Sequence, residues 1–351
     1  MLPLERLFRE MIAAEGPMRL DRYMGLCLGH PEHGYYMQGD PFGAEGDFIT
    51  APEVSQAFGE LIGIWCVAAW QAMGAPDNFS LVELGPGRGT LMTDILRTVG
   101  KAAPDFIRAA QVNLVETSPA LRACQAQAIG TGVCWHDALT TVPHGPMILV
   151  ANEFFDAIPI RQFEKRDGRW HERVIGLRDN RLVLGLVEAD IGSEGRDGDI
   201  VEFAPERNAI AGAIGERLAA APGAALIIDY GHLDSAPGDT LQAIRAHGFV
   251  SILDGPGRAD LTSHVDFAAL SREMAKAGAT VHPGLTQRAF LLAMGLEQRM
   301  AMLAARADPA MRATLERQTS RLAAADQMGN LFKVVSATSP GLATPYPFGR
   351  R

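Results

Sequence analysis

The feature that most constrains the fold of this chain is a short apolar strand that runs directly into three closely spaced glycines. Residues 81–90 read Leu-Val-Glu-Leu-Gly-Pro-Gly-Arg-Gly-Thr. An apolar run followed by glycines predicts a buried strand, a tight turn and the first residues of a helix. Such a unit is typical of α/β folds that bind a nucleotide at the carboxyl end of their sheet.

The spacing of the glycines favours one ligand over another. Dinucleotide-binding turns usually read G-x-G-x-x-G, whereas Gly85, Gly87 and Gly89 follow the pattern G-x-G-x-G. S-adenosylmethionine (SAM) has no phosphate, so glycines beside it act mainly by letting the backbone approach without a Cβ. We therefore expect these glycines and Thr90 to contact SAM, and Glu83 to hold its ammonium group directly or through water. The alternative for an isolated glycine pattern is an ordinary strand-to-helix turn.

Carboxylates also end the next two predicted strands. Residues 112–116 form an apolar strand that ends in Glu116, and a third strand ends near residues 133–137, at Asp137. We expect Glu116 to accept hydrogen bonds from both ribose hydroxyls, and Asp137 to accept one from the adenine amino group. Asp137 could equally be a helix N-cap, because a helix could begin after it.

The order of these elements predicts an α/β fold with inserted segments. Residues 1–75 are expected to form an N-terminal cap or lid, and residues 76–351 the main sheet with its helices. Two insertions are expected, at about 161–222 and 236–328. The first should be antiparallel, since alternating segments are joined by Asp167-Gly168 and Asp179-Asn180, which are hairpin turn pairs.

Several helix boundaries are visible in the sequence. A helix is expected from Ser55 to about Met73, where it leads into the first strand of the sheet. Thr286 and Asp308-Pro309 are good N-terminal signals for two long helices. Strands are further expected at residues 147–151 and 225–231.

Composition excludes several functional classes. The net charge of -9 argues against a nucleic-acid surface, which gains affinity by neutralising phosphates. No apolar run reaches membrane-spanning length, and no signal peptide is visible, so we expect a cytoplasmic protein. The four cysteines lack C-x-x-C spacing, and Pro31 interrupts the spacing of His30 and His33, so no metal site is expected.

Several motifs together resemble the MidA family of SAM-dependent methyltransferases, over nearly the whole chain. The residues that carry the resemblance are Gly34-Tyr35-Tyr36 and the segments 46–53, 83–91, 152–159, 229–231 and 260–267. The resemblance implies a class I, Rossmann-like methyltransferase with a mostly parallel seven-stranded sheet. It also implies protein arginine N-methylation, because mitochondrial members methylate an arginine on a core subunit of respiratory complex I as assembly factors. A protein substrate of that kind, or its bacterial counterpart, is therefore the implied partner.

The chemistry of arginine methylation points to carboxylates near the fourth strand. Guanidinium has a pKa above about 12, so an enzyme must orient its nitrogen towards the methyl carbon. Carboxylates can do this through bidentate hydrogen bonds. Glu153, which follows the fourth strand, is the first candidate, and Asp156 would share its side if the turn is helical. Asp47 and Glu53 could close over the site as part of a lid.

Other candidate residues have simpler alternatives. Asn152 is expected at the cofactor but could only cap a turn, and Asp156 could be the N-cap of a helix. Phe154 could contact substrate, although it or Phe155 is expected to be a core residue. Tyr35 and Tyr36 could only pack the cap onto the sheet, but two adjacent tyrosines of an extended segment cannot both point inward, so one of them is expected to face the pocket and bind substrate. His264 is either a catalytic base or a hydrogen-bonded structural residue.

Two other functional classes remain open from the sequence. The chain could be a non-catalytic assembly factor that keeps a methyltransferase fold, since fold alone does not secure function. It could also methylate a small molecule. The intact glycines, with Glu83 and Glu116, argue against the first class.

Overall fold

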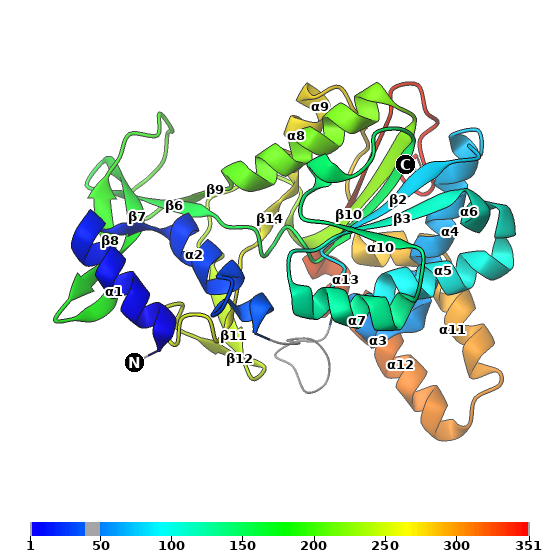
Figure 1. Cartoon of the computed structure of the whole chain (residues 1–351), viewed down its shortest axis with the longest axis horizontal. Helices are drawn as coiled ribbons and strands as arrows, with labels where there is room; N and C mark the ends of the chain where they lie inside the picture. The colour runs from blue at the N-terminus through cyan, green and yellow to red at the C-terminus, as the bar shows by residue number, and fades with distance from the viewer. Residues whose placement is uncertain (1, 39–49, 350–351) are drawn as a thin grey trace. The chain divides into compact units, whose positions relative to one another are not determined.

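The computed structural model describes residues 2–38 and 50–349, and the contacts between residues divide the chain into two compact units (Figure 1). We call the first the core unit; it comprises Ile49–Phe155, Ala209–Leu233 and Val265–Arg351. We call the second the accessory unit; it comprises Met1–Phe48, Asp156–Asn208 and Asp234–His264. The function of residues 1–75 as a cap remains a prediction.

The core unit is built on a mixed, mostly parallel sheet. Its main path runs β15-β17-β10-β5-β2-β3-β4. In addition, β14 pairs with β10, and β16 pairs with β17. Strands β10, β5, β2, β3 and β4 are parallel, and β17 is antiparallel to β10. The bounds are β2 Phe79–Leu84, β3 Ala110–Val115, β4 Val133–His136, β5 Met147–Asn152, β10 Gly223–His232, β14 Val265–Asp266, β15 Thr280–Val281, β16 Leu285–Thr286 and β17 Phe332–Thr338. This path of seven strands confirms the predicted fold class.

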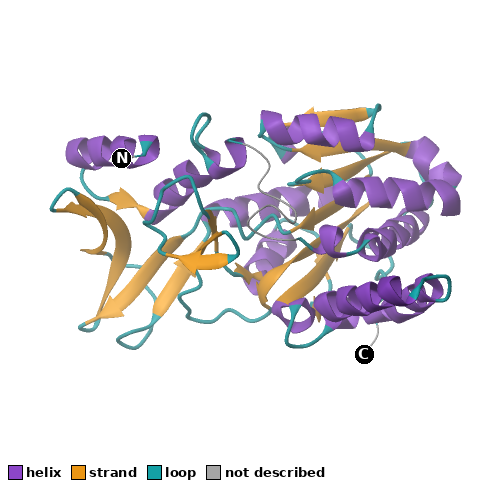
Figure 2. Ribbon diagram, turned by 90° about the horizontal axis from the view of Figure 1, so that it is seen from below, coloured by secondary structure: helices purple, strands orange, loops and turns teal. Residues whose placement is uncertain are grey.

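Helices cover both faces of this sheet (Figure 2). Successive side chains of a strand point to opposite faces, so Leu81 belongs to one hydrophobic cluster and Val82 to the other. The helices are α3 Ala51–Val54, α4 Gln56–Ala72, α5 Thr90–Ala102, α6 Pro104–Ala109, α7 Pro119–Ile129, α8 Pro205–Ala220, α9 Phe267–Lys276, α10 Gln287–Ala293, α11 Leu296–Ala304, α12 Pro309–Ala323 and α13 Met328–Leu331, with a 3-10 turn, η2 Leu139–Thr141. Both faces of β2, β5 and β10 are therefore buried, which explains their nearly continuous apolar sequences.

The predicted helix boundaries are confirmed with one correction. Ser55 accepts a hydrogen bond from Ala57 N and caps α4, and Thr286 and Asp308 cap α10 and α12 in the same way. However, the first of the two helices expected to be long is divided. Gly295, with φ of 97°, ends α10 and begins α11, because a left-handed residue cannot continue a helix.

The accessory unit packs helices α1 Pro3–Glu15 and α2 Leu20–Gly29 with an antiparallel sheet in the order β1-β7-β6-β9, to which β8 adds. Its strands are β1 Met18–Arg19, β6 Arg161–Arg166, β7 Arg169–Arg178, β8 Arg181–Glu188 and β9 Ile200–Phe203. The predicted hairpins are confirmed. Asp167, Gly168, Asp179 and Asn180 all have positive φ, as the two-residue turns that match strand twist require. A small sheet that the sequence analysis missed contains β11 Gln242–Arg245, β12 Gly248–Val250 and β13 Asp260–Thr262.

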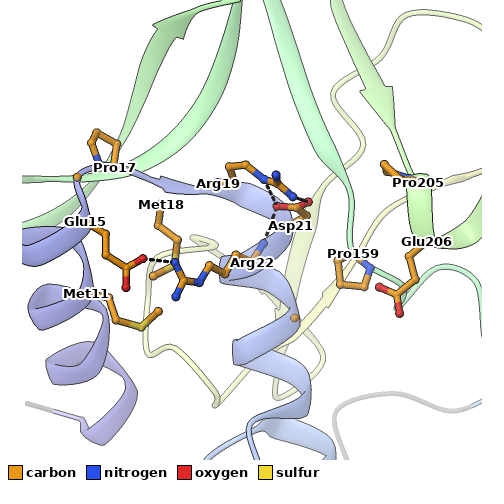
Figure 3. Close-up of a pocket in the computed structure, with 12 residues that line it drawn as sticks. Met11, Glu15, Pro17, Met18, Arg19, Asp21, Arg22, Pro159, Pro205 and Glu206 are labelled. Carbon is orange, nitrogen blue, oxygen red and sulfur yellow. Dashed lines mark hydrogen bonds and ion pairs between the residues drawn. The ribbon is translucent and has the colours of Figure 1, made fainter.

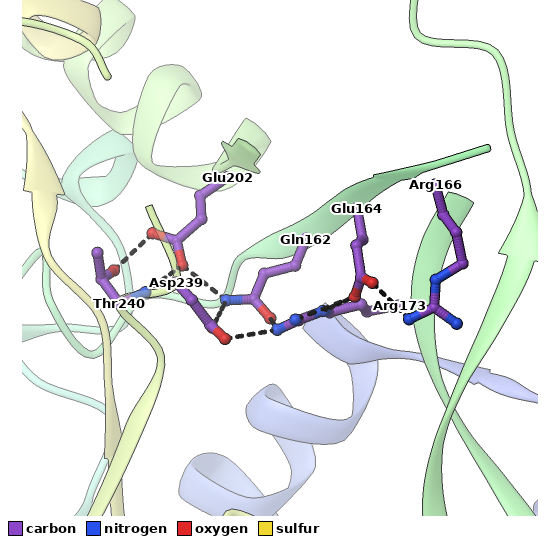
Figure 4. A network of polar contacts seen from close by, with 7 residues as sticks. All are labelled: Gln162, Glu164, Arg166, Arg173, Glu202, Asp239 and Thr240. Carbon is purple, nitrogen blue, oxygen red and sulfur yellow. Dashed lines mark hydrogen bonds and ion pairs between the residues drawn. The ribbon is translucent and has the colours of Figure 1, made fainter. Parts of the chain in front are cut away.

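A polar network joins distant segments of the accessory unit (Figure 4). The buried Gln162 donates to Glu202 Oε1 at 2.7 Å and to Asp239 Oδ1 at 2.9 Å. Arg173 reaches the other oxygen of Asp239 at 2.8 Å, and Thr240 N donates to Glu202 at 2.9 Å. The network fastens residues 239–240 to strands β6, β7 and β9. None of the helices that the structure describes is both long and apolar enough to span a bilayer.

Candidate cofactor and substrate site

The glycine turn after β2 leaves no room for a side chain at Gly85 and little at Gly89. Gly85, Gly87 and Gly89 have φ of 61°, 52° and 82°, a region that favours glycine. A Cβ at Gly85 would lie 2.7 Å from the ring of Phe154, and one at Gly89 would lie 3.4 Å from Cα of Gln125. The turn therefore brings its backbone against two neighbouring segments, and Thr90 begins α5 directly after it.

Two buried acceptors lie at the ends of neighbouring strands. Glu83 on β2 is 2% exposed, and Asn152 on β5 is 8% exposed. Within residues 2–38 and 50–349, no donor reaches Glu83 Oε2 or Asn152 Oδ1. Burial raises the pKa of Glu83 to about 8. A cationic donor would satisfy both orphaned oxygens and would stabilise Glu83 in its ionised form.

The carboxylate of Glu116, directly after β3, is held by helix α7. Ser118 N donates to Glu116 Oε1 at 2.8 Å, and Gln125 Nε2 donates to Oε2 at 3.3 Å. Arg122 Nε donates to the main-chain oxygen of Glu116 at 2.7 Å. Burial raises the pKa of Glu116, and the bonds from Ser118 and Gln125 oppose that rise. A carboxylate fixed on each oxygen by one donor still has acceptor capacity for a diol.

Asp137 follows β4, as predicted, but its side chain is well exposed. It accepts a hydrogen bond from Arg122 Nη2 at 2.6 Å. The alternative N-cap role is wrong: the next helical turn, η2, has Ala138 at its N-cap position with no side-chain bond. Contact of Asp137 with adenine stays a prediction.

Beyond β5, the chain takes an unusual backbone path at Glu153. Its φ is 50°, a left-handed conformation that is uncommon for residues other than glycine. Glu153 Oε1 accepts from Ala51 N at 2.8 Å and from Asn152 Nδ2 at 3.0 Å. The carboxylate therefore binds the first residue of α3 while it stays at the carboxyl end of the sheet. Strain of this kind costs about 1–3 kcal/mol and clusters at functional sites.

The same segment is anchored by a residue that the sequence analysis did not assign. Asp229 on β10 is fully buried, and its Oδ2 accepts from Phe155 N at 3.0 Å. Phe155 is a core residue, as expected for at least one of the two phenylalanines, and Phe154 packs over Gly85. A carboxylate directly after the apolar stretch 225–228 was the signal that could have identified Asp229.

The predicted lid residues are only partly described. Glu53, on α3, forms an ion pair with Arg88 of the glycine turn, with Oε1 and Nη1 3.5 Å apart. The segment that starts at Ala51 is thus tied both to the turn and to Glu153. Asp47 lies outside the described residues, so its predicted place in the site remains a prediction.

Tyr35 and Tyr36 lie in the accessory unit, on a 3-10 helix, η1 Tyr35–Met37. The prediction of an extended segment is therefore wrong. The 3-10 turn places the two rings edge to face, with their centroids 5.2 Å apart. Tyr35 is buried, and Tyr36 Oη donates to the buried Asp260 Oδ1 at 2.8 Å. Burial and the carboxylates of Asp260 and Asp156 raise the pKa of Tyr36. Asp260 is a second buried carboxylate that the sequence analysis did not single out.

Asp156 and His264 also belong to the accessory unit, where Arg207 binds the main chain of both. Arg207 donates to Asp156 O at 3.0 Å, to His264 O at 2.8 Å and to Ser263 Oγ at 2.6 Å. No helix begins at Asp156, so both its N-cap role and the helical turn that was to align it with Glu153 are wrong. The catalytic roles of Asp156 and His264 stay predictions.

The accessory unit contains a cavity of about 590 Å³ (Figure 3). It is lined by residues of α1, α2 and the start of α8, with Pro159, and contains the ion pairs Glu15–Arg22 and Arg19–Asp21. None of its lining residues belongs to the predicted site. Among the described residues, no cluster of His, Cys, Asp or Glu has the arrangement of a metal site.

The polar groups at the carboxyl ends of β2, β3 and β5 fit SAM. Its amino-acid ammonium is a donor for the orphaned oxygens of Glu83 and Asn152, and its ribose diol supplies donors for Glu116. Positive φ and the missing Cβ atoms at Gly85 and Gly89 let the turn pack closely on Phe154 and Gln125, beside these polar groups. Because SAM has no phosphate, it does not need to bind at a helix N-terminus.

Comparisons with known proteins agree with this geometry. Residues 61–284 match the family model described as "Putative S-adenosyl-L-methionine-dependent methyltransferase". The chain is 36% identical to the mitochondrial protein arginine methyltransferase NDUFAF7 of Danio rerio, over 93% of this chain and 84% of the relative. For the Homo sapiens protein of the same name, the identity is 35%, over 94% and 82%.

A solved structure supports the cofactor directly. A Burkholderia thailandensis protein bound to S-adenosyl-homocysteine (SAH) shares 26% identity and superposes with a TM-score of 0.84, covering 97% of this chain and 92% of that one. SAM is thus the cofactor, and the chain belongs to the MidA family of SAM-dependent methyltransferases.

Proposed function

We propose that this methyltransferase transfers its methyl group to an arginine side chain of a protein. The observation that carries the proposal is similarity along 93% of the chain to relatives named as protein arginine methyltransferases. From the resemblance to mitochondrial members of the family, we further propose that the target is an arginine of a respiratory complex I subunit or its bacterial counterpart. The acidic character of the chain, with a net charge of -9, suits a basic protein segment.

Glu153 is the residue that we propose to bind the guanidinium. It lies at the carboxyl end of β5, next to Asn152, and Ala51 N holds one of its oxygens at 2.8 Å. A carboxylate aligned with guanidinium N–H groups draws positive charge towards itself and leaves one nitrogen directed at the methyl carbon. The strained φ of Glu153 keeps its side chain in this position before substrate binds.

SAM supplies an electrophilic methyl group on a positively charged sulfur. In the proposed reaction, the arginine nitrogen forms a bond to that carbon as the carbon–sulfur bond breaks, and the nitrogen then loses one proton. We propose that Glu153, already bonded to the guanidinium, accepts this proton. Asp156, Asp47 and His264 remain candidates for catalysis. Tyr35, Tyr36, Glu53 and Phe154 remain candidates for binding the rest of the substrate.

The test is to incubate the protein with isotopically labelled SAM and a lysate from a strain that lacks its gene. Labelled proteins are identified by mass spectrometry, and acid hydrolysis shows which amino acid carries the methyl group. A Gly85→Val variant serves as the cofactor-deficient control, since its side chain would meet Phe154.

We expect one or a few labelled proteins that yield methylarginine, with no label from the control. Label in a small molecule, or on another amino acid, would overturn the arginine assignment and leave the methyltransferase assignment intact. SAM binding without transfer to any component would favour the non-catalytic assembly factor.

A further inference from the structure

The buried face of helix α7 contains a glutamine that contacts three segments of the cofactor site. Gln125 is fully buried. Its Nε2 donates to Gly87 O at 2.7 Å and to Glu116 Oε2 at 3.3 Å, and its Oε1 accepts from Trp135 Nε1 at 2.8 Å. One amide therefore joins the glycine turn, the end of β3 and strand β4.

The orientation of this amide is fixed by the chemistry of its partners. An indole N–H can only donate, so the atom that faces Trp135 must be the amide oxygen. A main-chain carbonyl and an ionised carboxylate can only accept, so the amide nitrogen must face Gly87 and Glu116. All three partners agree on one orientation, and rotating the amide by 180° would break all three bonds.

The surrounding structure leaves little freedom for this contact. A Cβ at Gly89 would lie 3.4 Å from both Cα and Cγ of Gln125, so α7 packs closely on the turn. Ser118 caps α7 through Leu121 N, and its own N–H binds the other oxygen of Glu116. Ser118, Arg122 and Gln125 are spaced i, i+4 and i+7, which places them on one face of the helix.

We propose that Gln125 is a positioning residue for SAM. It holds the Glu116 carboxylate at a fixed distance from the glycine turn, in the orientation that accepts the ribose hydroxyls. The inference rests on the assignment of Glu116 to the ribose, and it is independent of whether the methyl acceptor is arginine. Gln125 does not itself need to touch the cofactor.

The test compares three ligands by titration calorimetry: SAH and its 2′-deoxy and 3′-deoxy analogues. The variants are Gln125→Met, which keeps side-chain length but removes the donors, and Gln127→Met as a control on the exposed face of the same helix. In the wild type, loss of a hydroxyl bonded to a carboxylate should weaken binding about tenfold or more. Thermal unfolding monitors whether each variant is folded.

In Gln125→Met, we expect SAH affinity to fall about tenfold or more. The preference for SAH over at least one deoxy analogue should shrink to within about threefold, because the misplaced Glu116 carboxylate no longer accepts a hydrogen bond from that hydroxyl. Gln127→Met should match the wild type for all three ligands. If Gln125→Met instead loses the same affinity for all three ligands and keeps the wild-type preferences, Gln125 has only a structural role and the proposal is overturned. Equal binding of all three ligands by the wild type would also overturn it.

A second variant keeps the test valid if Gln125→Met does not fold. Gln125→Glu has nearly the same shape and retains an acceptor for Trp135, but it directs a carboxylate at Glu116. Its affinity for SAH should fall with rising pH, because only the protonated acid can donate to Glu116, and two adjacent carboxylates resist ionising together. A pH profile parallel to that of the wild type would contradict a positioning role.

Discussion

The two sides of the site in the core unit are assembled in opposite ways. On the cofactor side, Glu116 is held by Ser118 and Gln125, which are two and nine residues away in the sequence. On the proposed substrate side, Glu153 is held by Ala51, 102 residues away, and Phe155 N by Asp229, 74 residues away. The cofactor side is therefore a local strand–turn–helix structure, whereas the substrate side exists only once distant segments have packed.

The backbone shows the same contrast. Positive φ in the glycine turn falls on glycines, for which it costs little. Beyond β5, positive φ falls on Glu153, for which it is strained, so its neighbours must stabilise that conformation. Cofactor binding and substrate alignment should therefore respond separately to substitutions, except where the two sides touch.

The largest effect is expected at Gly85, where the cofactor side contacts Phe154 of the substrate side. Valine there would place a branched side chain 2.7 Å or less from the ring of Phe154, at a φ of 61° that valine rarely adopts. Gly85→Val should abolish measurable SAH binding in calorimetry while the circular dichroism spectrum keeps its α/β character. Binding within tenfold of the wild type would show that the turn can move away without loss.

Glu83→Gln should weaken SAH binding about tenfold or more, because a charged acceptor for the ammonium is lost.

The same change should stabilise the ligand-free protein relative to the wild type as pH rises. The pKa of this carboxyl is about 8 when buried and near 4.5 otherwise, so the unfolded chain loses its proton first. Native stability due to protonated Glu83 is fully present below about pH 4.5 and is lost progressively up to about pH 8.

Denaturant titrations at pH 5 and pH 8 test that linkage. The free energy of unfolding of Glu83→Gln relative to the wild type should rise between them, by at most about 1.4 kcal/mol per pH unit. A pH-independent difference would mean that Glu83 has an ordinary pKa.

Asp229→Asn tests the distant anchoring of the substrate side. Asp229 accepts from Phe155 N and from Tyr230 N with different oxygens, and an asparagine can accept with only one. Unfolding should cost about 1–3 kcal/mol less in the variant. Methyl transfer should fall more than SAH affinity, since the segment beyond β5 loses its anchor. A proportionate fall in both would remove the distinction between the two sides at this residue.

The smallest effect is expected at Arg88, whose side chain is 45% exposed and lies 3.5 Å from Glu53. A partly exposed ion pair contributes about 0–1 kcal/mol, and salt screens it. Arg88→Ala should therefore change the melting temperature little at 0.5 M salt, and only slightly more at low salt. A large, salt-independent loss would show that Arg88 has another role.

The sequence could predict the local structures and not the distant ones. The glycine turn, the carboxylate after β3 and the Asp167-Gly168 hairpin each occupy a few consecutive residues with distinctive backbone needs, so they were predicted correctly. Gln125 carries no such local signal, and the carboxylate of Asp229 beside an apolar stretch does not reveal its partner, because the partners of both residues are set by packing between separate elements. The divided helix at Gly295 was missed for a related reason, since a helical pattern tolerates an isolated glycine. The edge-to-face pair of Tyr35 and Tyr36 required a 3-10 turn that no residue of the segment demands.

The most direct test of whether cofactor binding and substrate alignment are separate is to measure both SAH affinity and methyl transfer in Glu153→Gln. The matched control is Glu297→Gln, on the exposed face of α11. The glutamine retains an oxygen for Ala51 N, but it loses the charge that aligns the guanidinium. We predict SAH affinity within about threefold of the wild type and a fall in transfer of about 100-fold or more, with the control unchanged. Loss of SAH affinity in proportion to activity would contradict the account and assign Glu153 to the cofactor side.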